Sequence, residues 1–381
     1  MPVPLPPQEV ALRTPPSRAE VLAIWRALVT AVGGGADGLS PLQDLLLRAV
    51  TTSMTGVGDL PPAEPVTPAD FAASMERRDR VFRERVCQVM MLGALVRRPP
   101  DSAAMRRVAD FAVELDLDGQ LVEVTASYAE GGFDLAVHDF ERLGHLGAGP
   151  APTPPGTSPL ADGAGSVWFQ VPDDPALAAR WGALGELPTG SLGRSVHDFY
   201  RARGFAFPGL PGSAPPMLAQ HDWVHVLADY GTALESELEV FGYIARANDD
   251  PRAFSLLAMV VSLFETGVVA RGMGLFEASP GHLASSGMPQ RLADALRRGA
   301  LTAGSRDFMT LDWFAVADRP VDVVRREWAV PPKSEVAVAL GSAGLSQPGG
   351  ISAYQESTGR AAAAAEGWDY QALVRASAPA P

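Results

Sequence analysis

Cysteine is almost absent from this sequence of 381 residues, which contains only Cys87. A single cysteine excludes an intramolecular disulfide and fits a reducing compartment. Cys87 lies in an apolar run, residues 86–91, and is therefore predicted to fill the core rather than to act as a nucleophile.

Positive charge is also scarce, with 31 Lys and Arg residues against 44 Asp and Glu residues and a formal net charge of −13. This balance argues against a nucleic-acid partner, because phosphates require a basic surface. Contact with an anionic membrane would need a local basic patch, so we expect at most peripheral membrane contact.

Long apolar segments are missing as well. The most apolar stretch, residues 253–269, is short for a transmembrane span and is followed closely by Arg271. Residues 1–7 lack a basic start and an apolar core, so no signal peptide is expected. The predicted location is the cytoplasm, with peripheral attachment to the inner membrane as the alternative.

Helical periodicity is plentiful and predicts an all-α chain with two helical domains. Residues 1–146 are predicted to form an amino-terminal helical domain, and residues 147–165, which contain five prolines, form a linker. Residues 166–332 are predicted to form the second domain, and residues 333–381 a poorly ordered tail with one helix near 360–375. The expected amino-terminal helices cover residues 18–32, 41–54, 67–98, 103–115, 119–128 and 133–143, and residues 167–171 have strand character.

Three side chains of the second domain are spaced for a metal site. On a helix, His221, Asp222 and His225 fall within an arc of about 100°, so two imidazoles and a carboxylate share one face. A histidine pair at this spacing also occurs as surface decoration, but the apolar neighbours make unpaired polar groups costly here. The pattern therefore indicates a candidate metal site.

A fourth candidate ligand, Glu237, would lie about 18 Å along the axis from His225 on a straight helix. It reaches the same ion only if the chain turns back. Gly231 can end the first helix and Thr232 can cap the next, so we predict a helical hairpin with one carboxylate on its second arm.

This motif resembles that of a known family. His-Asp-x-x-His followed after eleven residues by Glu is similar to the signature of the Coq-four family of ubiquinone-biosynthesis proteins. The likeness extends over residues 187–330, through the lead-in around residues 187–205 and closing segments around residues 297–299 and 311–327. The usual members lack the amino-terminal helical domain and the long tail.

The resemblance implies an oxidative decarboxylase that replaces the carboxyl group on the ring of a prenylated 4-hydroxybenzoate-type precursor by a hydroxyl group. A related aromatic acid of another pathway is an alternative substrate. His221, Asp222, His225 and Glu237 would be the ligands, and their donor types suit Zn, Fe or Mn equally. The residues expected to support catalysis are Arg194 and Tyr200, which would meet the substrate, and Asp229, which lies one helical turn beyond His225 on the same face and would hold an imidazole in place.

The sequence leaves alternatives for the role of residues 253–269, for the partners and for the function. Residues 253–269 favour core packing, with a wall for an isoprenoid tail as the alternative. The expected partners are a hydrophobic aromatic or prenylated small molecule, a second copy of the chain and other biosynthetic enzymes. Rival functions are a non-catalytic prenyl-lipid-binding scaffold and a phosphohydrolase of the His-Asp type, which would use His197 or His145 with His221 and Asp222.

Overall fold

The computed structural model describes residues 15–33, 38–97, 102–117, 173–247, 251–261 and 281–377. Within these ranges the chain is all-α, as predicted, and its only extended pairing is an isolated antiparallel bridge between Ser191 and Pro320. The predicted helices at 119–128 and 133–143, the linker at 147–165 and the segment 167–171 lie outside the described residues. The α-helices are α2 (Arg18–Gly33), α3 (Pro41–Thr55), α4 (Pro68–Ser74), α5 (Arg80–Leu95), α6 (Ser102–Glu114), α8 (Pro175–Gly182), α9 (Leu192–Arg203), α10 (Gln220–Ala228), α11 (Leu234–Ala247), α12 (Pro251–Val261), α13 (Met288–Leu301), α14 (Val321–Glu327), α15 (Glu335–Ala339), α16 (Ala353–Glu366) and α17 (Tyr370–Ser377).

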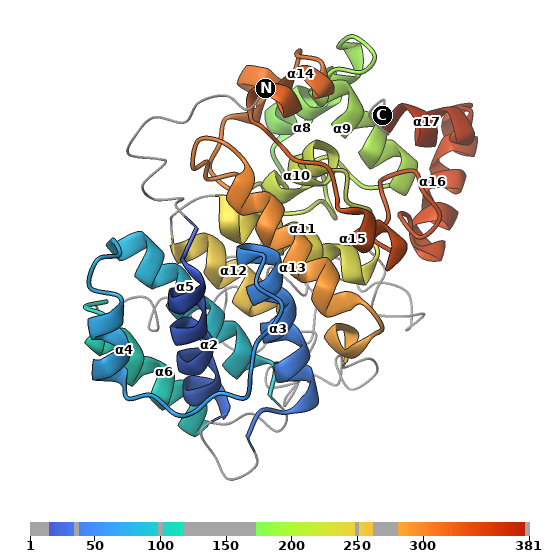
Figure 1. Cartoon of the computed structure of the whole chain (residues 1–381). Helices are drawn as coiled ribbons and strands as arrows, with labels where there is room; N and C mark the ends of the chain where they lie inside the picture. The colour runs from blue at the N-terminus through green and yellow to red at the C-terminus, as the bar shows by residue number, and fades with distance from the viewer. Residues whose placement is uncertain are drawn as a thin grey trace, which may run out of the picture.

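Helices α2 to α6 gather at one end of the molecule (Figure 1), where α2 packs against α3, α4, α5 and α6. The predictions for α2 and α3 are confirmed to within a residue or two. The predicted single helix over residues 67–98 is wrong, because it is divided into α4 and α5. Asp79 accounts for the break: its carboxylate accepts a hydrogen bond from the Phe82 N–H at 2.8 Å and starts a new helix.

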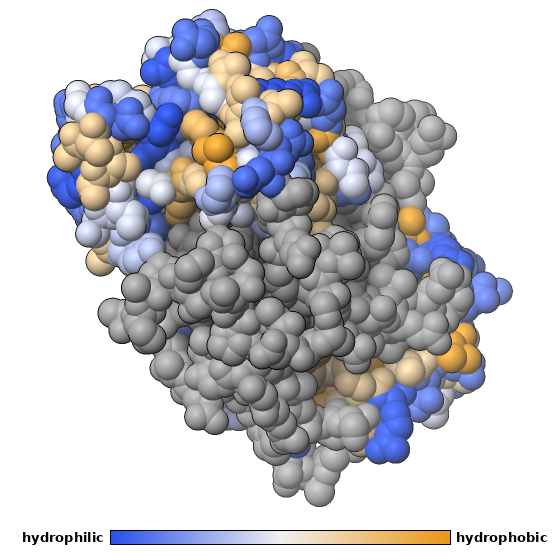
Figure 2. Space-filling model, turned by 180° about the vertical axis from the view of Figure 1, so that it is seen from behind, coloured by the Kyte–Doolittle hydropathy of each residue, from blue (hydrophilic) through white to orange (hydrophobic). Residues whose placement is uncertain are grey.

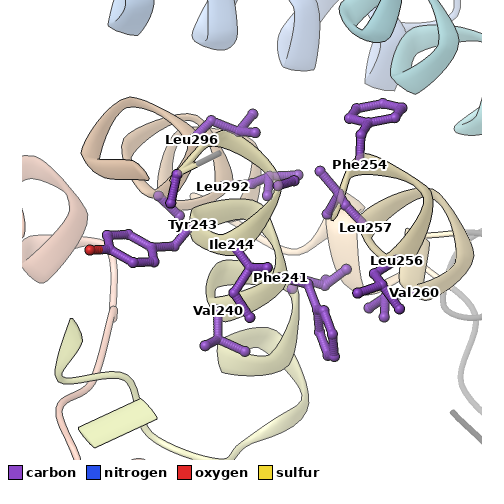
Figure 3. Close-up of a cluster of buried hydrophobic side chains, with 14 of the residues drawn as sticks. Val240, Phe241, Tyr243, Ile244, Phe254, Leu256, Leu257, Val260, Leu292 and Leu296 are labelled. Atoms are coloured by element: carbon purple, nitrogen blue, oxygen red, sulfur yellow. The ribbon is translucent and has the colours of Figure 1, made fainter. Parts of the chain in front are cut away.

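Helix α11 lies at the centre of the molecule between α12 and α13 (Figure 1). Figure 3 shows apolar side chains of α12 and α13 gathered around it, among them Leu257 and Leu292, both fully buried. The described part of the segment 253–269 is therefore core packing. Its predicted continuation beyond Val261 lies outside the described residues.

Helices α3 and α5 connect the amino-terminal helices to this central layer. The Ser53 hydroxyl donates to the Ala293 carbonyl of α13 at 3.1 Å, and Arg85 donates to the Ala245 carbonyl of α11 at 3.0 Å. The two helical regions therefore contact each other directly.

The carboxyl-terminal region differs from its prediction. Residues 335–377 include the helices α15, α16 and α17, and α16 and α17 pack against α9 (Figure 1). Gly359 allows the close approach, since a Cβ atom there would lie 2.1 Å from the Ala202 carbonyl oxygen. The predicted single helix near 360–375 is divided at Gly367, whose φ of 73° ends α16.

No helix in the described ranges is long and apolar enough to span a bilayer. In the view from behind (Figure 2), the described surface is mostly hydrophilic, and its strongly apolar residues are scattered. Exposed large apolar side chains such as Leu210 and Val336 occur on different elements. Single exposed residues of this kind are ordinary on a folded surface.

Candidate metal centre

The predicted ligands lie on two consecutive helices that pack on each other, α10 and α11. Helix α10 ends at Ala228, and the next residue, Asp229, has a left-handed φ of 57°. The turn continues through Gly231 and Thr232 before α11 begins at Leu234. The break therefore falls two residues earlier than predicted. A left-handed aspartate is less costly than most residues, because its short side chain can bond locally.

This turn brings Glu237 back to the histidines. Its Oε2 lies 3.4 Å from His221 Nε2, and its Oε1 lies 3.4 Å from His225 Nε2. One ligand atom from each of the three side chains lies within 4.8 Å of the others, and all three are at most 2% exposed. Two ligands at 2.1 Å from an ion, at the tetrahedral angle, are about 3.4 Å apart, so the separations match a metal site.

The outer nitrogen of each imidazole faces a main-chain carbonyl. His221 Nδ1 lies 2.5 Å from the Leu218 oxygen, and His225 Nδ1 lies 3.2 Å from the Tyr230 oxygen. A carbonyl only accepts, so both Nδ1 atoms carry a proton, and both Nε2 atoms face Glu237. A proton held on Nδ1 leaves Nε2 as the ring atom that would bind a metal.

The Glu237 carboxylate has no hydrogen-bond donor among the described residues. Within the described part of the chain, neither of its oxygens accepts a hydrogen bond, and His225 Nε2 also has no hydrogen-bond partner. Burial would raise the pKa of Glu237, but His225 and His221 lower it, and the net direction is downward. A buried carboxylate without donors is costly, and a bound cation would offset that cost.

Aromatic rings cover both imidazoles. Phe241 stacks on His221 with ring centroids 5.0 Å apart, and Phe199 stacks on His225 at 5.8 Å. The tryptophan next to the motif, Trp223, is fully buried. The ligands therefore lie in an apolar environment, where electrostatic interactions are stronger than in water.

Asp222 lies beside this group but is not one of its three members. Its Oδ2 accepts a hydrogen bond from the Tyr200 hydroxyl at 2.5 Å, and its Oδ1 lies 3.7 Å from His221 Nε2. The ligand role of Asp222 stays a prediction. Tyr200 contacts this carboxylate, and a contact with substrate also stays a prediction.

Arg194 and Asp229, the other two residues expected to support catalysis, bind protein groups outside the metal group, and the contact of Arg194 with substrate stays a prediction. Arg194 binds the Asp198 carboxylate at 3.0 Å and the Gly185 carbonyl at 2.7 Å. Asp229 accepts a hydrogen bond from the Leu345 N–H at 3.1 Å. Because its backbone is left-handed, Asp229 leaves the helical spacing from which its contact with an imidazole was predicted. The Leu218 and Tyr230 carbonyls hold the imidazoles instead.

Two arginines bind the carboxyl end of α10, and no role was predicted for either of them from the sequence. Arg325 donates to the Leu227 carbonyl at 2.7 Å and to the Val226 carbonyl at 3.1 Å, while Arg298 donates to the Ala228 carbonyl at 2.9 Å. These carbonyls have no partner within the helix. Cationic donors at a helix carboxyl end are favourable, so both arginines stabilise the helix that carries the histidines.

The geometry does not place His197 with the metal group, as a phosphohydrolase of the His-Asp type would require. Its Nδ1 lies 3.0 Å from Asp198 Oδ1, and its ring packs on Phe207. His145, the other candidate, lies outside the described residues.

No protein-family model matches the chain, and no curated protein matches it. A solved structure from Nostoc punctiforme, of a protein provisionally assigned to ubiquinone biosynthesis, aligns with 66% of this chain and 98% of its own. The sequence identity is 17% and the TM-score is 0.28. Values this low assign the chain to no family.

Proposed function

We propose that this chain is a metalloenzyme that replaces the carboxyl group of a hydrophobic aromatic acid by a hydroxyl group. The ligands would be Nε2 of His221, Nε2 of His225 and the Glu237 carboxylate. The observation that carries the proposal is the convergence of these buried groups at 3.4 Å, with the carboxylate lacking hydrogen-bond donors in the described residues. The substrate class follows from the resemblance of the motif to the Coq-four family.

Replacing the carboxyl group by a hydroxyl group releases carbon dioxide and removes two electrons from the substrate, and dioxygen would accept them: ArCO2H + O2 + H2O gives ArOH + CO2 + H2O2. A bound divalent ion supplies a Lewis acid for the substrate's carboxylate or phenolate, and iron or manganese also supplies redox capacity. The chain would hold the imidazoles in the required tautomer through the Leu218 and Tyr230 carbonyls. Phe199 and Phe241 would exclude water from the ligands.

The test begins with metal analysis of the purified full-length chain and anaerobic titration with Fe(II), Mn(II), Zn(II) and Co(II). The loaded protein is then mixed with 4-hydroxybenzoates carrying alkyl or prenyl chains, under oxygen, and products are identified by mass spectrometry. We expect stoichiometric binding of at least one ion, followed by carbon dioxide release and a hydroxylated ring.

Two results separate the alternatives. Metal binding with no turnover of any aromatic acid would favour the prenyl-lipid-binding scaffold. Failure of all four ions to bind with micromolar or tighter affinity would remove the metalloenzyme altogether.

A further inference from the structure

The turn between α10 and α11 is bound by a distant part of the chain, residues 342–355, which we name the strap. The Gly231 N–H donates to the Ala343 carbonyl at 3.0 Å, and the Thr232 N–H donates to the Gly350 carbonyl at 2.9 Å. In the opposite direction, a strap N–H donates to the side chain of Asp229. Main-chain groups of both segments therefore pair over the length of the turn.

Buried side chains extend this pairing. Gln355 is fully buried, and its Nε2 donates to the Thr232 carbonyl at 3.1 Å while its Oε1 accepts from the Thr232 hydroxyl at 2.6 Å. Arg203 of α9 donates to the Thr232 hydroxyl oxygen at 2.8 Å and to the Leu345 carbonyl at 3.1 Å. One guanidinium thus joins the turn to the strap.

The two backbones also touch where both residues are glycine. A Cβ atom on Gly231 would lie 2.5 Å from the Gly350 Cα, and within the strap itself a Cβ atom on Gly350 would lie 1.9 Å from the Gly344 carbonyl oxygen. Contacts this short are available only without side chains. The strap fits this turn closely, although it contributes no member of the metal group.

We infer that the strap is a positioning element for the metal centre, and that strap docking and metal binding stabilise each other. The inference rests on the proposed metal site. The turn sets the distance between Glu237 on α11 and the histidines on α10, and coordination tolerates only small departures from its distances. Because coupling is reciprocal, a metal that prefers the docked strap must also stabilise docking by the same factor.

The experiment uses the full-length chain and zinc as the probe. Zinc affinity is measured by competition titration for the wild type, Gln355→Ala, Thr232→Val and the conservative Thr232→Ser. Glu356→Gln is the matched control, because its side chain is 47% exposed and pairs with Arg360 instead of the turn. Hydrogen exchange of peptides covering the strap is followed in the wild type with and without zinc.

We expect zinc to slow exchange in the strap of the wild type. Gln355→Ala and Thr232→Val should weaken zinc binding about tenfold, no more than the smallest effect of removing a group that bonds a ligand directly, because both side chains bond the turn and the strap instead. Thr232→Ser and Glu356→Gln should bind as the wild type does. If the strap only stabilised the fold, the variants would unfold more easily, but zinc would not change hydrogen exchange in the strap.

Two outcomes overturn the inference in distinguishable ways. Tight zinc binding by the wild type, with unchanged strap exchange and unchanged affinity in both variants, would overturn the coupling and leave the metal centre standing. No zinc binding by the wild type would overturn both. The exchange measurement needs no variant, so it decides the matter even if a substitution prevents folding.

Discussion

Replacing Glu237 with glutamine substitutes an amide for the carboxylate that faces both imidazoles at 3.4 Å. Loss of an outer-shell partner typically weakens metal binding about 10- to 100-fold, so loss of a direct ligand should cost at least about 100-fold. At a zinc concentration 1,000 times the wild-type Kd, binding stabilises the fold by about 4.1 kcal/mol. In Glu237→Gln the same concentration gives about 1.4 kcal/mol, a difference of about 2.7 kcal/mol.

Competition titration measures the affinity, and urea unfolding with and without zinc measures the stabilisation. Glu235→Gln is the control, since Glu235 lies in the same turn of α11 but pairs with His282. The control should keep the full effect of zinc. The reasoning would be refuted if Glu237→Gln bound zinc as tightly as the wild type. It would also be refuted if the substitution lowered the free energy of unfolding by the same amount with and without zinc, because that is the effect of losing a purely structural ion pair.

Two further predictions concern other polar contacts. Tyr200→Phe removes a 2.5 Å hydrogen bond to the carboxylate next to His221 and should weaken zinc binding about tenfold, measured by titration; unchanged affinity would contradict it. The hydrogen-bonded Arg78 guanidinium lowers the pKa of Glu20 from 4.5 to about 2. Since the folded pKa is the lower one, this pair stabilises the fold above pH 4.5 and loses that effect as pH falls toward 2. Urea unfolding of Arg78→Leu should therefore show its largest deficit near neutral pH and a shrinking deficit in acid; a constant deficit would argue against the pair.

Local signals were sufficient for much of the fold and for the core of the site. The apolar periodicity of α2 and α3 predicted both helices, and the spacing of His221 and His225 with the glycine at 231 predicted that Glu237 would return to them. Each of these features depends on neighbours in sequence. In the structure, ligand atoms of the three side chains lie within 4.8 Å of one another, while metal binding stays a proposal.

Features that depend on distant partners were not predictable in the same way. The alanine- and glycine-rich tail has the composition of a disordered segment, yet Gln355 is buried against Thr232, a residue 123 positions away. Asp229 was assigned to an imidazole from helical spacing, which fails once its backbone turns left-handed. The main-chain carbonyls that hold the imidazoles could not be predicted from the sequence, because every residue has a carbonyl group.

Charge balance gives Asp222 a role whether or not it coordinates the ion directly. A divalent ion bound by two neutral imidazoles and the Glu237 carboxylate alone would leave one net positive charge in a site whose ligands are at most 2% exposed. The Asp222 carboxylate, with Oδ1 3.7 Å from His221 Nε2, supplies the second negative charge. Opposite charges about 4 Å apart attract by about 4 kcal/mol at an effective dielectric constant of 20.

Asp222→Asn keeps an oxygen for the Tyr200 hydroxyl but removes the charge, so zinc affinity should fall by up to about 1,000-fold, the equivalent of that energy. A titration in which Asp222→Asn binds zinc as tightly as the wild type would show that the site tolerates the uncompensated charge, and the ion would then be held by the other three side chains alone.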